Sequence, residues 1–202
     1  MGNVGKIKVD FTQGKMRYRF AHLSRRTELL IKAIGWRQNA PLHVFDTTAG
    51  FGKDAFLMGA CGCQVTLFER VPVVLSLLKQ GLHQATFYPP FAATLSRLTL
   101  LETCAIDFLS NASFSLPDVI YCDPMFPERK KSAAVKKEMQ FLQATVGEDN
   151  DAQQLVTLSL QKAKKRVVVK RSALAPSFFP QPDFMLKGKS FRFDIYLCSG
   201  EK

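Results

Sequence analysis

The sequence contains no long hydrophobic run. None of its apolar stretches approaches the ~20 residues that an α-helix needs to cross a bilayer. Residues 1–6 also lack the apolar core of a secretory signal peptide. We therefore expect a cytoplasmic protein with no membrane partner.

Cysteine is scarce and is not spaced as in a metal site. The five cysteines lie at positions 61, 63, 104, 122 and 198. Cys61 and Cys63 have one intervening residue where a zinc knuckle has two or more, and no second Cys/His pair follows. The sequence therefore predicts no metal site, and it indicates small buried thiols in a reducing compartment.

Acidic residues are the scarcer charged class, and the imbalance is uneven along the chain. The net charge is +11. Residues 1–40 carry nine basic and two acidic residues (+7), residues 41–128 four and eight (−4), and residues 129–202 fifteen and seven (+8). Because each basic residue near a phosphate releases counterions, the two basic flanks indicate a nucleic-acid partner.

Short apolar runs of strand length alternate with amphipathic segments of helix length. This alternation is typical of α/β proteins whose sheet is largely parallel. Near the C-terminus, Phe191, Phe193, Ile195 and Leu197 instead recur at the period of a strand. The expected strands are 42–45, 64–68, 97–101, 118–122, 166–170, 184–186 and 191–197, and the expected helices are 53–60, 72–83 and 152–163.

The last two expected strands form an antiparallel hairpin around the turn 187–190 at the edge of the sheet. Five parallel strands followed by such a hairpin match the class I methyltransferase layout, a Rossmann-like fold, better than that of a dinucleotide dehydrogenase. We predict that residues 41–202 form this domain and that the basic N-terminal segment 1–40 packs on it.

A glycine-containing turn follows the first expected strand, between Asp46 and the helix that begins at residue 53. In a doubly wound sheet, ligands bind where the first strand leads into a helix N-terminus, and glycine lets the backbone approach a ligand. We predict that Gly50 and Gly52 line a cofactor site. The turn alone leaves a nicotinamide cofactor open, since Ala55 fits the third position of a GxGxxG/A pattern.

Carboxylates at the next strand ends favour S-adenosylmethionine. Glu69 ends the second expected strand, where it can accept hydrogen bonds from both ribose hydroxyls of an adenosine. Asp107 follows the third, where it can meet the adenine amino group. An acidic site suits the sulfonium and ammonium of S-adenosylmethionine, and it suits the pyrophosphate of NAD less well.

The run Asp123-Pro124-Met125-Phe126 follows the fourth expected strand, next to the predicted cofactor site. The Asp123 carboxylate and the Pro124 carbonyl can accept hydrogen bonds from an exocyclic amine and aim its lone pair at a methyl donor. Phe126 can stack on the base. We predict that these three residues form the catalytic acceptor site. The basic residues expected to hold flanking phosphates are Arg129, Lys130, Lys131, Lys136, Lys137, Lys170 and Arg171.

Together these motifs resemble the RsmJ (YhiQ) family of bacterial methyltransferases. The resemblance covers the chain from residue 9 onward, and it is most specific in the second half. The chain departs from the family in having almost none of an additional N-terminal segment, and in lacking a glycine-rich stretch at residues 20–28. The matching segments are 9–11, 46–55, 68–74, 123–127, 131–133, 135–139, 165–171 and 192–196.

The resemblance implies methylation of the exocyclic N2 amino group of a guanine in 16S ribosomal RNA, with S-adenosylmethionine as donor. It also implies a set of cofactor-pocket residues, namely Lys53, Asp54, Glu69, Arg70, Cys104, Ala105 and Asp123. From the residues alone, adenine-N6 methylation, protein-amide methylation and a non-catalytic RNA-binding or ribosome-assembly role on the same fold stay open.

Overall fold

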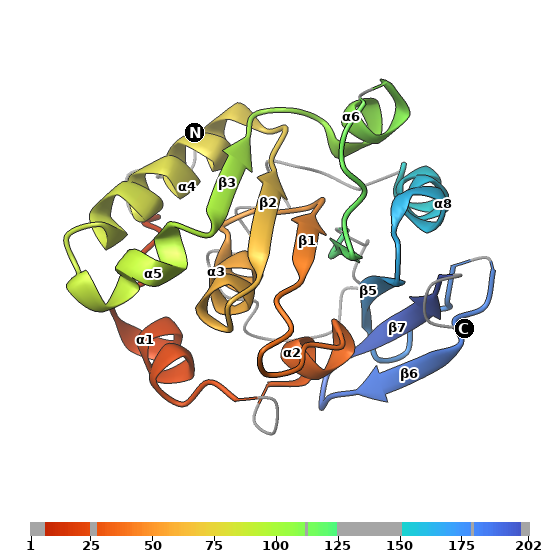
Figure 1. The fold of residues 1–202 in the computed structure, drawn as a ribbon, viewed down its shortest axis with the longest axis horizontal. Helices are drawn as coiled ribbons and strands as arrows, with labels where there is room; N and C mark the ends of the chain where they lie inside the picture. Colours follow the sequence, from red (N-terminus) through yellow and green to blue (C-terminus); the bar gives the residue numbers. More distant parts are fainter. Residues whose placement is uncertain (1–6, 25–27, 112, 125–150, 179, 199–202) are drawn as a thin grey trace.

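The computed structural model of the protein describes residues 7–24, 28–111, 113–124, 151–178 and 180–198. These residues contain a seven-stranded sheet with the strand order β3-β2-β1-β4-β5-β7-β6 (Figure 1). The strands are β1 (His43–Asp46), β2 (Gln64–Phe68), β3 (Leu98–Leu101), β4 (Val119–Cys122), β5 (Arg166–Ser172), β6 (Phe184–Lys187) and β7 (Phe191–Leu197).

The sheet has a parallel part and an antiparallel edge. β3, β2, β1, β4 and β5 are parallel neighbours in that order. β7 runs antiparallel to both β5 and β6. The chain winds outward from β1 through β2 to β3 and then returns to place β4 on the other side of β1. This arrangement confirms the predicted class I methyltransferase fold.

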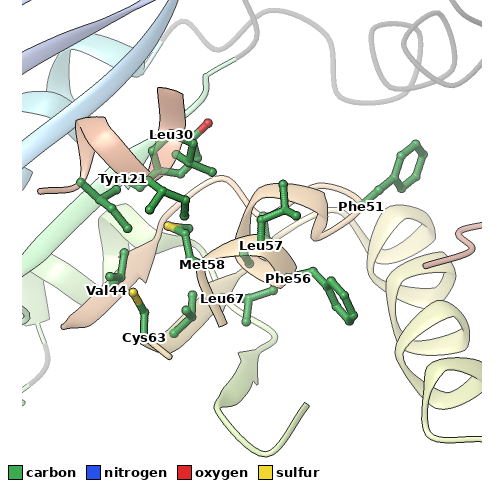
Figure 2. Packing of buried hydrophobic residues seen from close by; sticks show 14 of the residues in the cluster. Leu30, Val44, Phe51, Phe56, Leu57, Met58, Cys63, Leu67 and Tyr121 are labelled. Atoms are coloured by element: carbon green, nitrogen blue, oxygen red, sulfur yellow. The ribbon is translucent and has the colours of Figure 1, made fainter. Parts of the chain in front are cut away.

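Helices pack against both faces of the sheet because successive strand residues point to opposite sides. Val44 belongs to the hydrophobic cluster formed with α3 (Lys53–Ala60) and α4 (Pro72–Ala85), whereas Phe45 belongs to the cluster formed with α6 (Ala105–Asn111) and α8 (Ala152–Lys162). Figure 2 shows Met58 of α3 near Val44. The helices are α1 (Gly14–Ala21), α2 (Leu29–Ala33), α3 (Lys53–Ala60), α4 (Pro72–Ala85), α5 (Ala92–Leu95), α6 (Ala105–Asn111) and α8 (Ala152–Lys162), with a 3₁₀ turn η2 (Pro89–Phe91).

The N-terminal residues that the structure describes share the core of the parallel sheet. Phe11 is 1% exposed, and its ring stacks on that of Phe56 in α3 at 4.6 Å between centroids. Val9 lies against Gly81 of α4, where a Cβ atom would come within 2.8 Å of the Val9 Cβ and 3.0 Å of its carbonyl oxygen. These contacts fit the expected packing of segment 1–40, while its boundary at residue 40 stays a prediction.

Substitution of Gly81 by alanine is expected to destabilise the protein by about 1–3 kcal/mol, the usual cost of overpacking a filled core. Alanine favours a helix over glycine by about 1 kcal/mol, so a net loss requires the clash with Val9 to dominate. Urea unfolding measures the change, and Gln80→Ala, exposed one residue earlier in α4, is the control. A Gly81→Ala protein as stable as wild type would contradict the close docking of Val9.

Three of the five cysteines, Cys63, Cys122 and Cys198, are buried, and Cys61 and Cys104 are half-buried. All five are free thiols. Within the described ranges, no three His, Cys, Asp or Glu side chains converge as metal ligands. No helix in the same ranges has the length and apolar character needed to span a membrane.

Candidate active site

The carboxyl ends of the parallel strands bring polar side chains to one edge of the sheet. Asp46 ends β1, Glu69 follows β2, Asp123 follows β4, and Lys170 lies near the end of β5. Because the chain turns in opposite directions from β1 and β4, a crevice is expected between their ends, where α/β proteins bind ligands. The predicted donor and acceptor residues therefore lie on adjacent strands.

The turn after β1 is tied to the neighbouring strand end. The Thr47 amide and hydroxyl both donate to the Tyr121 carbonyl, at 3.0 and 2.9 Å. The Thr48 Oγ1 accepts a hydrogen bond from the Asp123 amide at 2.6 Å. These bonds fix the entry to the glycine turn relative to the residues that follow β4.

The two predicted glycines, Gly50 and Gly52, are suited to their positions for different structural reasons. Gly50 has φ = 53°, and a Cβ atom there would meet only the Thr48 carbonyl oxygen, at 3.9 Å. Gly52 has φ = 69°, and its Cβ would lie 2.6 Å from the buried Leu78 Cδ1 of α4. Gly50 is therefore open toward a ligand, whereas helix packing is sufficient to require glycine at 52.

Glu69 connects this turn to the end of β2. One carboxylate oxygen accepts from the Gly50 amide at 2.9 Å, and the other accepts from the Val71 amide at 2.7 Å. The side chain is 7% exposed, and burial raises the pKa of its carboxyl group although the backbone hydrogen bonds oppose the shift. A carboxylate offers about four acceptor positions, so two backbone donors leave capacity for ribose hydroxyls.

Three further predicted cofactor residues lie close to Glu69 in the fold. Arg70 extends its guanidinium to Cys104, with 3.9 Å between Nη1 and Sγ, and to Asp151 at the start of α8, at 2.5 Å. Ala105 is buried at the beginning of α6. Asp107, expected at the adenine amino group, is exposed in the first turn of α6. Its role in the cofactor site stays a prediction.

Asp123 and Pro124 are the predicted acceptor residues that the structure describes. The Asp123 side chain is 37% exposed, and its Oδ2 accepts a hydrogen bond from Lys170 Nζ at 2.6 Å. Pro124 is buried. The Asp123 carboxylate is therefore held at one end by an ammonium group while part of its surface faces solvent.

Asp54 lies beneath this pair rather than at the surface. Its Oδ2 accepts hydrogen bonds from Lys170 Nζ at 3.0 Å and from the Tyr121 hydroxyl at 2.7 Å. Arg19 Nη1 of α1 lies 3.9 Å from the other oxygen. Figure 2 shows Tyr121 among the side chains packed between α3 and the sheet. Asp54 is thus the centre of a charged cluster built from four separate elements.

The charges in this cluster shift one another's titration. Burial alone raises the pKa of Asp54, but the Lys170 charge and the Tyr121 hydrogen bond outweigh it and lower the pKa. Burial lowers the pKa of Lys170, but the charges of Asp123 and Asp54 raise it by more, so the pKa of Lys170 increases overall. At pH values between the ordinary pKa of aspartate and that of lysine, these ion pairs contribute their full stabilisation of the fold. The stabilisation is lost in acid as Asp54 becomes protonated, and in alkali as Lys170 loses its proton.

Of the predicted RNA-contacting residues, the structure describes Lys170 and Arg171. Lys170 lies within the charged cluster, and Arg171 is 5% exposed, with its guanidinium 4.1 Å from the Phe178 ring centroid and a hydrogen bond to the Pro176 carbonyl. Lys53 of the predicted cofactor set lies over the Phe51 ring. The remaining predicted residues, Phe126, Arg129, Lys130, Lys131, Lys136 and Lys137, lie outside the described residues.

Sequence reasoning did not identify Thr47, Thr48, Tyr121 or Arg19 as parts of this site. Two polar residues directly after β1 are a weak signal for the first pair, since that position faces the ligand edge in this fold. The tyrosine within the otherwise apolar strand β4 is a weak signal for a buried hydroxyl that needs a partner. Nothing in the local sequence of α1 distinguishes Arg19 from its neighbouring basic residues.

Comparison with known proteins identifies the family to which this chain belongs. Residues 1–198 match the family described as "Putative SAM-dependent methyltransferase". The curated protein "Ribosomal RNA small subunit methyltransferase J" of Marinobacter nauticus is 45% identical over 96% of this chain and 71% of its own length. Its namesake in Pseudoalteromonas atlantica is 44% identical over 97% of this chain and 78% of its own length.

The chain belongs to this methyltransferase family. The crystal structure of a SAM-dependent methyltransferase from Neisseria gonorrhoeae agrees in fold, with a TM-score of 0.72 and 32% sequence identity over 98% of this chain and 78% of that one. The predicted resemblance to RsmJ is thereby confirmed, and S-adenosylmethionine is the family's cofactor.

The residues at the strand ends fit S-adenosylmethionine. Glu69 keeps acceptor capacity beside the open side of Gly50, as an adenosine ribose requires. Asp123 after β4 and Asp54 in the first turn of α3 add negative charge beside the glycine turn, where a sulfonium would be stabilised. Burial, followed by the nearby Asp54 charge, raises the pKa of Asp46 well above its usual range, which favours the neutral form of this carboxyl group.

Proposed function

We propose that this protein methylates the exocyclic N2 amino group of a guanine in 16S ribosomal RNA. The observation that carries the proposal is the place of Asp123, which follows β4 beside the Gly50 turn and whose side chain is 37% exposed. The printed name of the curated relatives supports small-subunit ribosomal RNA as the substrate. The choice of guanine N2 rests on the resemblance to the RsmJ family.

The chemical task of the site is to make a weak nucleophile reactive. The lone pair of an exocyclic guanine amine is delocalised into the ring, so an N–H group held by a carboxylate favours a more tetrahedral nitrogen. The Asp123 carboxylate and the Pro124 carbonyl supply two acceptors at adjacent positions. Fixed orientation accounts for much of the rate in such a step, because it makes a bimolecular reaction effectively unimolecular.

S-adenosylmethionine supplies a methyl group that is bonded to a positively charged sulfur. The guanine N2 lone pair forms the new N–C bond while the electron pair of the C–S bond leaves with the sulfur. The proton is lost from N2 after transfer and passes to solvent, so Asp123 is required as an acceptor and not as a strong base. The carboxylates of the site balance the positive charge present before transfer.

The proposed RNA partner is consistent with the charge of the chain. The flanks 1–40 and 129–202 carry +7 and +8, whereas the segment 41–128 that supplies most of the cofactor site carries −4. Basic residues outside an acidic pocket attract the phosphate backbone without competing for the cationic donor. Stacking of Phe126 on the target base, and phosphate contacts by residues 129–137, belong to this proposal.

Methyl transfer from tritiated S-adenosylmethionine separates the possible acceptors. We expect label in small-subunit particles or in 16S ribosomal RNA, and none in DNA or protein. Label confined to DNA or protein would instead favour an adenine or protein-amide methyltransferase. Failure to bind S-adenosylmethionine in calorimetry would favour a non-catalytic assembly factor. RNA binding, measured by competition at two salt concentrations, tests the proposed role of the basic residues, since binding to RNA phosphates weakens as the salt concentration rises.

A further inference from the structure

Lys170 occupies an uncommon place for a lysine. Its side chain is only 27% exposed, and its Nζ lies between two carboxylates, 2.6 Å from Asp123 Oδ2 and 3.0 Å from Asp54 Oδ2. Asp123 follows β4, and Asp54 lies in the first turn of α3. A single ammonium group therefore joins the acceptor side of the site to the helix that follows the glycine turn.

The elements around Lys170 place several other ionisable groups near this contact. Asp46 ends β1 and is 1% exposed. Tyr121 of β4 donates its hydroxyl to Asp54, and Arg19 of α1 lies 3.9 Å from the same carboxylate. Lys170 contacts two members of an acidic group, and Arg19 contacts one of them. Removal of the Lys170 charge would therefore take a cation away from both Asp54 and Asp123.

We propose that Lys170 is a positioning residue for methyl transfer, whose ammonium group keeps the Asp123 carboxylate ionised and oriented to accept the N–H of the target amine. The inference rests on the function proposed above. It replaces the expectation that Lys170 grips an RNA phosphate, because both of its short contacts are made within the site.

The physical reason lies in the hydrogen-bonding capacity of a carboxyl group. An ionised carboxylate only accepts, with about four acceptor positions, of which Lys170 uses one on Oδ2. A protonated carboxyl presents an O–H donor, which would face the N–H donors of the amine. Without Lys170, repulsion among Asp46, Asp54 and Asp123 favours the retention of a shared proton.

The test compares Lys170→Met with wild type in two measurements. In NMR titrations of ¹³C-labelled aspartate carboxyl groups, we expect Asp54 and Asp123 to titrate at higher pH in the variant. In turnover assays on small-subunit RNA, we expect kcat to fall about 10²-fold at neutral pH, with KM for RNA little changed. The acid limb of the pH–rate profile should shift to higher pH, so that activity partly returns as the pH rises.

Two further variants control the charge and the fold. Lys170→Arg keeps the positive charge, and its kcat should be about tenfold higher than that of Lys170→Met. Lys165→Met removes a lysine at the opposite end of β5, where its Nζ lies 3.1 Å from Asp118 Oδ1, and should leave kcat and the titrations unchanged. If Lys170→Met does not fold, Lys170→Gln is measured instead, with the same expected shift.

Two outcomes would overturn the inference. A rise in KM for RNA at unchanged kcat would assign Lys170 to a phosphate contact. Unchanged carboxyl titrations, with an equal loss of turnover at every pH, would reduce it to a structural residue. The NMR titration needs no methyl acceptor, so it shows whether Lys170 keeps Asp123 ionised even if wild-type protein labels no ribosomal RNA and the proposed function fails.

Discussion

Substitution of Asp123 by alanine is expected to lower methyl transfer at least about 10³-fold, the scale of losing a fixed group that orients and stabilises the reacting atoms. The variant loses the acceptor for the target amine but keeps the amide of residue 123, which donates to Thr48 Oγ1. Lys170 also keeps Asp54 as a partner at 3.0 Å, so no ammonium is left buried without a counter-charge. The fold should therefore survive.

The measurement is single-turnover transfer into small-subunit RNA, with S-adenosylmethionine affinity determined separately by calorimetry. Asp118→Ala is the matched control, because Asp118 precedes the opposite end of β4 and accepts from the His43 amide at 2.9 Å. That variant should lose on the order of 1 kcal/mol of stability and retain its turnover. Near-normal turnover of Asp123→Ala would refute the role assigned to Asp123.

Substitution of Glu69 by glutamine should weaken S-adenosylmethionine binding by about 10- to 100-fold, equivalent to ~1.4–2.7 kcal/mol. The carboxylate holds the Gly50 and Val71 amides, and an amide side chain would turn an NH₂ group toward one of these donors. Because burial raises the pKa of Glu69, wild-type affinity should begin to fall, as the pH is lowered, at a higher pH than an exposed glutamate would give.

Calorimetry across pH measures both effects, and thermal unfolding without ligand shows how far the turn itself is weakened. Glu102→Gln is the control, since Glu102 follows β3, is exposed and pairs with Lys79 at the surface. It should leave the affinity unchanged. Equal affinities for wild type and Glu69→Gln, in proteins of similar stability, would remove Glu69 from the cofactor site.

The regular elements could be predicted where the local pattern and the tertiary environment agree. The predicted bounds of α3 (Lys53–Ala60) and β2 (Gln64–Phe68) match the structure. The predicted bounds of β7 (Phe191–Leu197) match as well. α4 continues two residues beyond the expected end, to Ala85, because Ala85 is buried in the core.

Elements that depend on distant partners could not be predicted in this way. α1 is exposed along most of its length, and it is held through Met16, which is buried in the main core, and Phe20, which packs against that core. The sequence also places Lys170 in a basic cluster, a setting that suggests a surface role. Its partners Asp54 and Asp123 lie 116 and 47 residues away, so the fold alone reveals the ion pairs.

The same distinction applies to the site. The sequence allowed the positions of Gly50, Glu69 and Asp123 to be inferred, because the carboxyl ends of parallel strands meet at one edge of the sheet regardless of the loop conformations. Asp107 lies in the first turn of α6 and is exposed, and its contact with adenine stays a prediction. Phe178 packs against the guanidinium of Arg171, which is 5% exposed, and the expected RNA contact of Arg171 stays a prediction.

Mass mapping of modified guanines in 16S ribosomal RNA tests the central claim most directly. RNA from cells with and without the protein is digested and compared, with the Asp123→Ala protein supplied to the deficient cells as a further sample. The account predicts one N2-methylguanine that disappears without the protein and returns with wild type but not with Asp123→Ala. An unchanged set of N2-methylguanines, or the loss of a methyl group at adenine, would contradict it.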